Sequence, residues 1–213
     1  MALSKVNFNS LNVTPSASKF LAWDGDADAL ATADIGGSLT LLSTQTASSS
    51  ASLDFTSGID STYKEYIFKF INIHPATDEA HFTVGFRDGG TDYDATKTTS
   101  YILSYHAEDN SETSLAYNAG SDLAQSTGFQ RILHGVGNGN DESASGYLHL
   151  FDPSSTTFVK HFIAGGSSYN AGSYEYTTYV SGYNNVTAAI DGVQFKMSSG
   201  NIDSGVIKMY GVS

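Results

Sequence analysis

The chain has 213 residues, of which 40% are hydrophobic and only 15% charged, and it contains no cysteine. This length and hydrophobic content suit one large domain, or one domain with an arm. The lack of cysteine excludes disulfides and thiolate zinc sites. A net charge of −12 repels phosphates and anionic lipid, so we expect no nucleic-acid partner.

Hydropathy gives no membrane or secretion signal. No window of about 20 apolar residues predicts a membrane span, and residues 1–20 lack the apolar core of a signal peptide. We therefore expect synthesis in the cytoplasm without membrane insertion.

Residues 1–50 differ in pattern from the rest and predict an extended N-terminal arm with two or three short strands, used for docking or oligomerisation. The arm holds the only tryptophan, Trp23. Its last part, 43–52, is almost wholly Ser, Thr, Ala and Gln, which is typical of a connector or a sheet edge.

An acidic turn in the arm resembles the start of a calcium loop, since Asp24, Asp26 and Asp28 alternate with other residues. Ala29 and Ile35 stand where that loop needs Gly and Glu. A solvated turn is therefore the favoured interpretation, and these three aspartates stay weak metal candidates.

The stretch 63–87 predicts two strands around a turn at 74–78, where Pro75 cannot donate to a ladder. We expect these strands to pair as an antiparallel hairpin that forms the spine of the core. Apolar residues alternate in both strands. They are Tyr66, Phe68 and Phe70 on one face of the first strand, Ile67, Ile71 and Ile73 on its other face, and Ala80, Phe82, Val84 and Phe86 in the second.

Two further hairpins are expected, one joining 147–151 to 157–163 and one joining 193–197 to 206–212. More strands are predicted over 53–56, 100–106, 129–133 and 174–180. Eight or more strands at roughly ten-residue spacing, with no helix periodicity, predict an all-β fold. We expect residues 51–213 to form an antiparallel β-sandwich of jelly-roll-like type.

No catalytic or cofactor motif is found. The six histidines show no zinc-binding spacing, and there is no Gly-x-Ser-x-Gly elbow. His149 and His161 are expected to be neighbours across the second hairpin. Distant carboxylates for glycoside hydrolysis, such as Glu175 or Asp191, stay open because a sandwich can bring them together.

A crowd of tyrosines beside Gly/Ser/Asn loops is the strongest candidate for a binding site. Aromatic faces with nearby hydroxyls and amides suit sugars or protein partners, although tyrosine is also a common strand residue. The candidates for contact with a glycan or a partner are Tyr169, Tyr174, Tyr176, Tyr179 and Tyr183.

Two stretches carry a family resemblance. One is STQTASSSASLDFTSGIDSTY over 43–63, followed by Tyr66 and by HPATD over 74–78; the other is SSGNIDSGVIKMYGV over 198–212. They resemble virion structural proteins of tailed bacteriophages, especially marine phages, over roughly residues 35–213, and the start MALSKV looks similar too. These are turn and strand motifs, so the resemblance transfers no active site.

The resemblance implies a non-enzymatic, tail-associated or fibre-like protein that is made in the host cytoplasm, joins the virion and contacts host-surface glycan through its loops. It also implies a homo-oligomer, often a trimer, with other virion proteins as partners. A capsid decoration protein whose arm clamps capsid subunits is the first alternative, and a virion-borne carbohydrate-active enzyme is the second.

Overall fold

A computed structural model of the chain describes residues 19–23, 30–34 and 38–213. The chain divides into two units, Met1–Ser38 and Leu39–Ser213. In the first unit, β1 (Lys19–Trp23) pairs antiparallel with β2 (Leu30–Asp34). Asp24, Asp26 and Asp28 lie outside the described residues.

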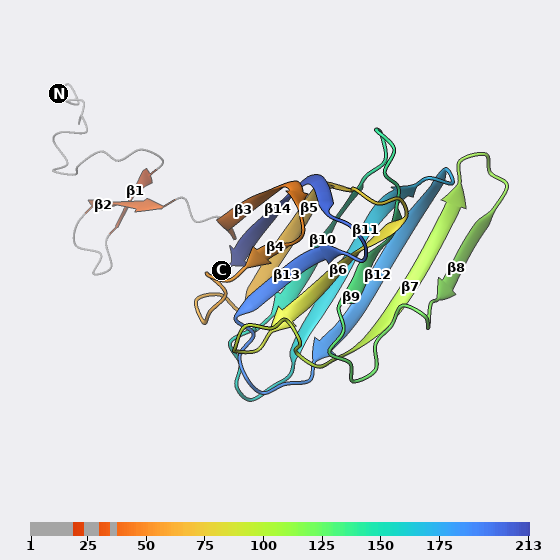
Figure 1. The fold of residues 1–213 in the computed structure, drawn as a ribbon. Helices are drawn as coiled ribbons and strands as arrows, with labels where there is room; N and C mark the ends of the chain where they lie inside the picture. Colours follow the sequence, from red (N-terminus) through yellow and green to blue (C-terminus); the bar gives the residue numbers. More distant parts are fainter. Residues whose placement is uncertain (1–18, 24–29, 35–37) are drawn as a thin grey trace, which may run out of the picture. The chain divides into compact units, whose positions relative to one another are not determined.

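The second unit consists of two antiparallel sheets packed face to face (Figure 1), which confirms the predicted all-β sandwich. Among the described residues, no helix is long and apolar enough to cross a membrane. The large sheet has eight strands in the order β3 (Leu39–Ser50), β14 (Ile202–Val212), β5 (Glu65–Pro75), β10 (Ala144–Phe151), β11 (Lys160–Asn170), β12 (Tyr174–Asn184), β7 (Lys97–Ala107) and β8 (Thr113–Tyr117). The small sheet has four, in the order β4 (Leu53–Phe55), β13 (Gly192–Met197), β6 (Ala80–Arg87) and β9 (Gln130–Val136).

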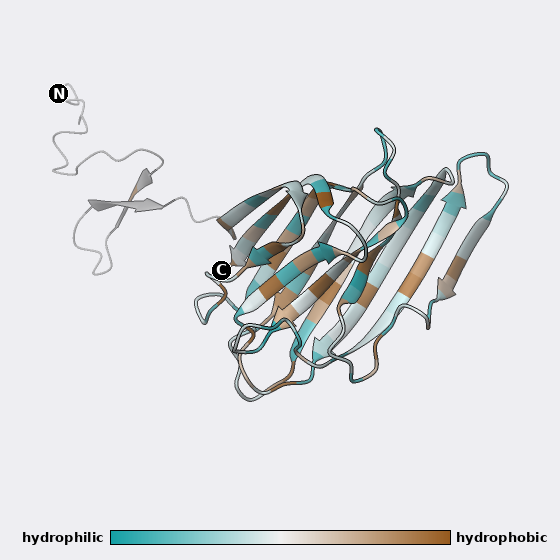
Figure 2. Ribbon diagram, in the orientation of Figure 1, coloured by the Kyte–Doolittle hydropathy of each residue, from teal (hydrophilic) through white to brown (hydrophobic). Residues whose placement is uncertain are grey.

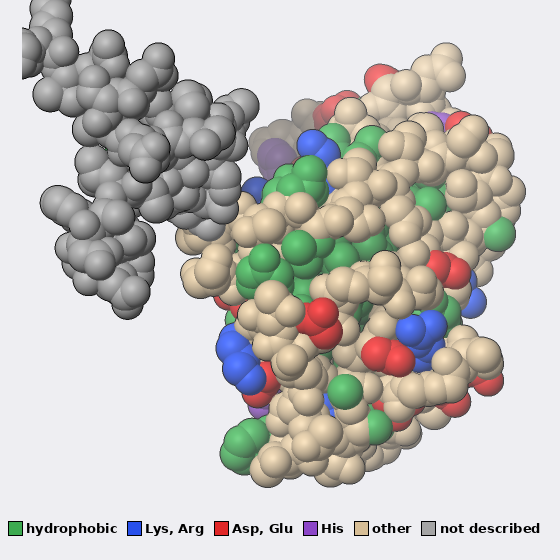
Figure 3. All heavy atoms as spheres, turned by 90° about the vertical axis from the view of Figure 1, so that its left-hand side faces the viewer, with side chains coloured by type: hydrophobic (Ala, Val, Ile, Leu, Met, Phe, Trp, Pro, Cys, Tyr) green, Lys and Arg blue, Asp and Glu red, His purple; other side chains and the backbone are tan. Residues whose placement is uncertain are grey.

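The segment 39–50, expected in the arm, is the edge strand β3 and pairs with β14 along its length. Its hydroxyl-rich sequence fits an edge, where one side of the strand has no ladder partner. Seen from the end that carries β3 and β4 (Figure 3), most of the described surface is uncharged polar side chain or backbone, with hydrophobic side chains gathered near the middle.

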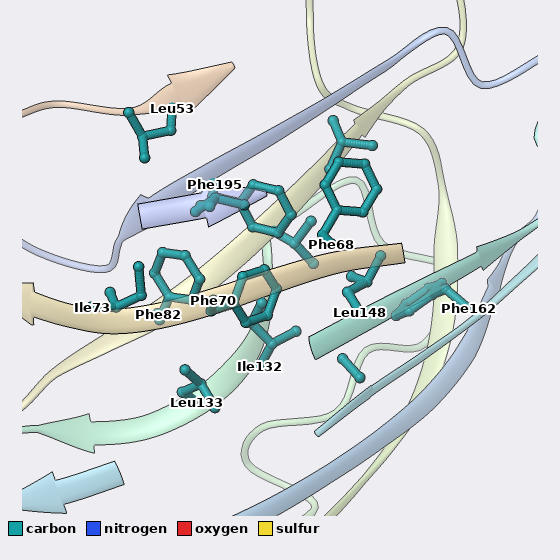
Figure 4. Close-up of a cluster of buried hydrophobic side chains, with 14 of the residues drawn as sticks. Leu53, Phe68, Phe70, Ile73, Phe82, Ile132, Leu133, Leu148, Phe162 and Phe195 are labelled. Carbon is teal, nitrogen blue, oxygen red and sulfur yellow. The ribbon is translucent and has the colours of Figure 1, made fainter. Parts of the chain in front are cut away.

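Phenylalanines fill the space between the sheets, and Phe195 of β13 lies at their centre. Its ring centroid is 5.1 Å from Phe70, 5.4 Å from Phe68 and 5.6 Å from Phe82, and Phe55 closes the cluster at 6.1 Å. All five side chains are buried, and several of them are drawn in Figure 4. Each such side chain contributes roughly 1.5–3 kcal/mol by leaving water.

The expected hairpin over 63–87 is wrong. β5 and β6 lie in different sheets, so the chain arches from one layer to the other between them. Phe70 and Phe82 meet edge to face across the core, with ring centroids 5.2 Å apart. The arch is favoured over a hairpin because it buries the apolar faces of both strands against each other.

The last expected hairpin is wrong for the same reason, since β13 lies in the small sheet and β14 in the large one. The middle hairpin is confirmed, because β10 pairs antiparallel with β11. Its register places His149 opposite Ile163, so the expected His149–His161 pair does not form. His149 forms an ion pair with Glu65 of β5 instead.

A local irregularity in β5 decides which isoleucines face water. Asn72 has a positive φ of 50°, and the pairing of β5 with β14 shifts register beside it. An inserted residue of this kind reverses the alternation that follows. Ile73 is therefore buried, whereas Ile71 is 41% exposed, although the sequence placed both on one face.

Candidate binding site on the outer sheet face

The large sheet has one face against the small sheet and one face turned away from it, here named the outer face. Alternate residues along each strand point to opposite faces, and Figure 2 shows hydropathy alternating along several strands. On β12, for example, Thr178 and Val180 are buried, whereas Glu175, Thr177 and Tyr179 are exposed. The outer face is thus formed by the residues of each strand that alternate with the buried ones.

Four large side chains form a line across this face, here named the outer row. Tyr117 of β8 lies opposite Ile102 of β7, which lies opposite Tyr179 of β12. Tyr179 then lies opposite Gly165 of β11, and Gly165 opposite Tyr147 of β10. The exposed fractions are 57% for Tyr117, 40% for Ile102, 43% for Tyr179 and 38% for Tyr147. These apolar surfaces therefore face solvent in consecutive strands.

Gly165 makes the row continuous by leaving room for its neighbour. A Cβ atom at Gly165 would lie 3.1 Å from the Tyr147 hydroxyl oxygen and 3.3 Å from Tyr147 Cζ. The Tyr147 side chain therefore extends over β11 towards the strand that carries Tyr179. With no side chain at Gly165, the phenol ring covers the backbone there.

A hollow of about 540 Å³ adjoins the row over β7, β12, β11 and β10. His161 and Tyr183, which are cross-strand partners, pack edge to face with centroids 6.0 Å apart. Ser100 and Ser181 hydrogen bond to each other at 3.0 Å. The hollow thus combines ring faces with hydroxyls. Its outer-facing lining residues are Thr98, Ser100, Phe151, His161, Ile163, Ser181 and Tyr183.

The structure divides the five tyrosines singled out in the sequence. Tyr169, Tyr179 and Tyr183 point to the outer face, because they alternate with the buried residues of their strands. Tyr174 and Tyr176 point to the inner face, where their rings stack 6.1 Å apart. The period-two alternation of β12 separates the two sets.

Tyr169 lies at an acidic end of the outer face. Its hydroxyl donates to Glu108 at 3.4 Å, and Glu108 and Glu175 line a hollow of about 370 Å³ with it. Glu175, considered above as a catalytic carboxylate, accepts hydrogen bonds from Ser167 and Thr177. Asp191, the other such residue, pairs with Arg87 at 2.8 Å. The two carboxylates therefore have separate structural partners.

Two half-buried histidines, His81 of β6 and His134 of β9, pack together away from the outer face. The rings of His81 and His134 lie 4.8 Å apart, and the Gly135 amide donates to His81 Nδ1 at 2.9 Å. Burial, together with the nearby Arg131 guanidinium, lowers the pKa of each imidazole to about 4. Both rings are thus neutral at pH 7.

The neighbours of this pair give it no metal-binding set. It borders a small cavity of about 130 Å³ that Glu79, Asn170 and Tyr176 also line. Within the described residues, no group of three His, Cys, Asp or Glu side chains has an arrangement that fits a metal ion. The pair is part of the packed interior rather than of the outer face.

Two lysines are fully buried at the inner face, on either side of Asn184 in the register of β7, β12 and β11. Lys97 Nζ donates to the carbonyl of Gly128 at 2.8 Å, and Lys160 Nζ donates to that of Val186 at 2.9 Å. Burial lowers the pKa of Lys97 to about 8. These ammonium groups fix the loops that contain Gly128 and Val186 by hydrogen bonds. They are too deeply buried to contact a ligand on the outer face.

Sequence reasoning missed most of the outer row. Alternation already placed Ile102 and Tyr147 opposite the apolar positions of their own strands. The lateral order of the strands, which brings Tyr117, Ile102, Tyr179 and Tyr147 into one line, has no local signal. It depends on pairings between residues far apart in the chain.

Comparison with known proteins adds no relative: no family model, no curated protein and no solved structure matches the chain.

Proposed function

We propose that this chain is a non-enzymatic structural protein of a tailed-phage particle, tail-associated or fibre-like, and that its outer face contacts host-surface glycan. The observation that carries the binding role is the outer row, in which three exposed tyrosine rings and Ile102 form a line across the large sheet. The phage assignment is supported by the resemblance of 43–63, Tyr66, 74–78 and 198–212 to virion proteins.

The side chains of the outer face suit contact with a sugar better than burial in an apolar interior. Tyrosine rings offer apolar faces to the C–H groups of a sugar ring, and a phenol hydroxyl can also hydrogen bond. In the outer row the Tyr117 hydroxyl already donates to Asp122. Ser100, Ser181 and Thr98 add hydroxyls at the adjoining hollow. The face is also open, so a polymer can lie along it without entering a pocket.

Binding without catalysis is supported by the way the acids on this face are held. Glu65 pairs with His149, and Glu175 is hydrogen bonded by Ser167 and Thr177. A glycoside hydrolase of the common type needs two carboxyl groups across one sugar linkage. Absence of reducing-sugar release from host polysaccharide is the matching expected result.

Self-association belongs to the same proposal. We expect a closed homo-oligomer, a trimer, held among other virion proteins and repeating the outer face around its axis. Weak sugar contacts gain strength when several copies bind one surface, because each later contact is intramolecular. Light scattering of the purified chain tests this stoichiometry.

Binding of purified host-cell polysaccharide, measured by biolayer interferometry, tests the glycan role. We expect Tyr179→Ala to weaken binding about tenfold, because one stacking platform of ~1–1.5 kcal/mol is lost. Tyr174→Ala is the matched control, since it removes a tyrosine of the same strand from the opposite face. Equal loss in both variants, or no binding by the wild-type chain, would reject the proposal.

Copy number in purified virions tests the place on the particle. A tail-associated protein should be present in roughly tens of copies and a decoration protein in roughly hundreds, as the symmetry of the two structures implies. Gel densitometry against the major capsid protein gives this number. Hundreds of copies would favour the decoration alternative, and absence from virions would reject the phage assignment.

A further inference from the structure

Two lysines that lie side by side continue the line of the outer row beyond Tyr147. Tyr147 of β10 is opposite Lys69 of β5, and Lys69 is opposite Lys208 of β14. Both lysines alternate with buried residues of their strands and therefore point to the outer face. Like charges directly opposite each other destabilise a sheet. The pair is thus an energetic cost that an anion would relieve.

Neither lysine is neutralised by a carboxylate among the described residues. The ion pairs found there are Lys64–Asp152, Arg87–Asp191, His74–Asp203 and His149–Glu65. The nearest outer-facing acid on the same strand, Glu65, is four residues from Lys69, or roughly 13 Å along the strand. Lys69 Nζ instead lies 5.5 Å from the centroid of the Tyr210 ring.

Most other Lys and Arg side chains of residues 39–213 are buried or have a polar partner, and the pair differs from them because its two ammonium groups lie on adjacent strands. Lys97 and Lys160 donate to loop carbonyls in the interior. Lys196 lies over the Phe129 ring at 3.9 Å, and Arg131 donates to Ser121 at 2.8 Å. In a chain of net charge −12, two adjacent ammonium groups with no carboxylate partner within the described residues mark a local positive site.

The charge of the outer face is also directional. Its positive end lies at Lys69 and Lys208, whereas Glu108 and Glu175 gather near Tyr169. An anionic polymer is repelled from the acidic end and attracted to the lysines. The outer row leads from Tyr117 to the lysine pair over six strand spacings, roughly 29 Å.

We propose that the lysine pair is an anion subsite and that the glycan is an acidic polysaccharide. Its sugar rings lie on Tyr179 and Tyr147, and a carboxylate or sulfate of the same chain lies between Lys69 and Lys208. This inference rests on the proposed glycan-binding role and specifies its substrate class. Charge-assisted hydrogen bonds to two ammonium groups supply the preference for acidic over neutral chains.

Matched pairs of polymers test the inference by calorimetry at low salt. Oligogalacturonides and their fully methyl-esterified forms differ in carboxylate charge, and dextran sulfate and dextran differ in sulfate. We expect at least one acidic member to bind about tenfold more tightly than its neutral partner (~1.4 kcal/mol). The arm in which this difference appears identifies the acidic group.

Variants of the full chain locate the effect. The double variant Lys69→Gln/Lys208→Gln should lose the preference for the acidic member and keep its affinity for the neutral one. It should also melt at the same or a slightly higher temperature without ligand, because the repulsion is gone. Lys196→Gln, which removes one charge from the other sheet, is the control and should keep the preference.

Several results would overturn the inference. One is an unchanged preference in the double variant, and another is an equal loss in Lys196→Gln, which would indicate an unspecific charge effect. Equal binding of acidic and neutral members, lost in Tyr179→Ala, would leave the glycan role standing and reject the lysine subsite. Failure to bind any of the four polymers would also reject the inference, while the host-polysaccharide assay judges the proposed function separately.

Discussion

The two faces of the eight-stranded sheet are made by the same strands yet carry different aromatic chemistry. The inner face buries Phe68, Phe70 and Phe162 together with Tyr66 and Tyr101, whereas the outer face exposes Tyr147 and Tyr179. A phenyl ring loses nothing by leaving water, while an exposed phenol keeps its hydroxyl in contact with water or ligand. The inner face therefore stabilises the fold, and the outer face is available for recognition.

The largest expected effect of a single substitution lies at Phe195 of the small sheet, which packs against the inner face. Phe195→Ala should lower the free energy of unfolding by ~3–5 kcal/mol, because it leaves a cavity among four other phenylalanines. Urea denaturation followed by far-ultraviolet circular dichroism measures this loss. Tyr179→Ala on the outer face should change the same quantity by less than ~0.5 kcal/mol. Similar losses at both positions would contradict the division of roles between the faces.

The half-buried imidazoles predict an acid-sensitive interior. The pKa values of His81 and His134 are lowered to about 4 in the folded chain, against about 6.5 in the unfolded chain. Between these values the unfolded chain binds more protons, so stability should fall as the pH drops from about 6.5 to about 4. The two shifts set an upper limit of roughly 7 kcal/mol for this loss, and we expect about half of it because both imidazoles are only part-buried. Urea denaturation at each pH measures the loss.

The double variant His81→Gln/His134→Gln is the control for that loss. It should be less stable at pH 7 but should show a flatter pH dependence between about 6.5 and 5, above the range in which ordinary carboxylates titrate. Arg131 and Glu79 face the pair and stay unchanged in this variant. An equally steep dependence with and without the imidazoles would show that other groups cause it.

Two adjacent glycines sharpen the comparison, because they point to opposite faces. A Cβ at Gly166 would lie 2.4 Å from the Ser145 carbonyl oxygen and 2.6 Å from Leu133 Cδ2, so the backbone must move. Gly166→Ala should cost ~1–3 kcal/mol. A Cβ at Gly165 meets the end of the Tyr147 side chain at 3.1 Å, which can swing away, and the Thr178 carbonyl oxygen at 3.2 Å, a milder contact than those at Gly166. Gly165→Ala should therefore cost less stability but weaken glycan binding by displacing Tyr147.

Thermal melts and the polysaccharide assay, applied to both glycine variants, check this reversal. The inner variant should lose mainly stability and the outer variant mainly affinity. Gly89→Ala, where the open space around the Cβ position leaves only backbone strain at a φ of 102°, is a reference for a glycine away from both faces. If one glycine variant lost more than the other in both stability and affinity, the two faces would not differ in role.

The smallest expected effect separates the ring of Tyr147 from its hydroxyl. Tyr147→Phe keeps the platform and should weaken polysaccharide binding by about threefold or less, since one exposed hydrogen bond is worth ~0.5 kcal/mol. Tyr147→Ala removes the ring and should weaken binding about tenfold. Biolayer interferometry on both variants gives the ratio, and an equal loss would assign the contact to the hydroxyl.

The three expected hairpins show how far local pattern reaches. The β10–β11 hairpin is confirmed, but β5–β6 and β13–β14 connect the two sheets. Alternation within Phe82, Val84 and Phe86 reports that one side of the strand is apolar. It does not report whether the preceding strand lies beside that strand or across the core, because both arrangements bury the same side chains.

The sequence likewise predicted only part of the candidate site, because local pattern does not show how the strands are ordered. Of the five tyrosines singled out in the sequence, Tyr169, Tyr179 and Tyr183 lie on the outer face, whereas Tyr174 and Tyr176 lie on the inner face. Ile73 was misplaced because Asn72 reverses the alternation at a positive φ of 50°. A local irregularity of this kind leaves no mark in the spacing of apolar residues.

By itself, the sequence determined the all-β class, the positions of most strands and the side chains that share a face within each strand, because these follow from a period of two along a short segment. Only the tertiary structure decided the order of the strands, the two arches and the line that joins Tyr117 to Lys208. Strand order depends on pairings between distant segments that compete for the same core. The outer row is a consequence of those pairings, since each strand supplies only one of its members.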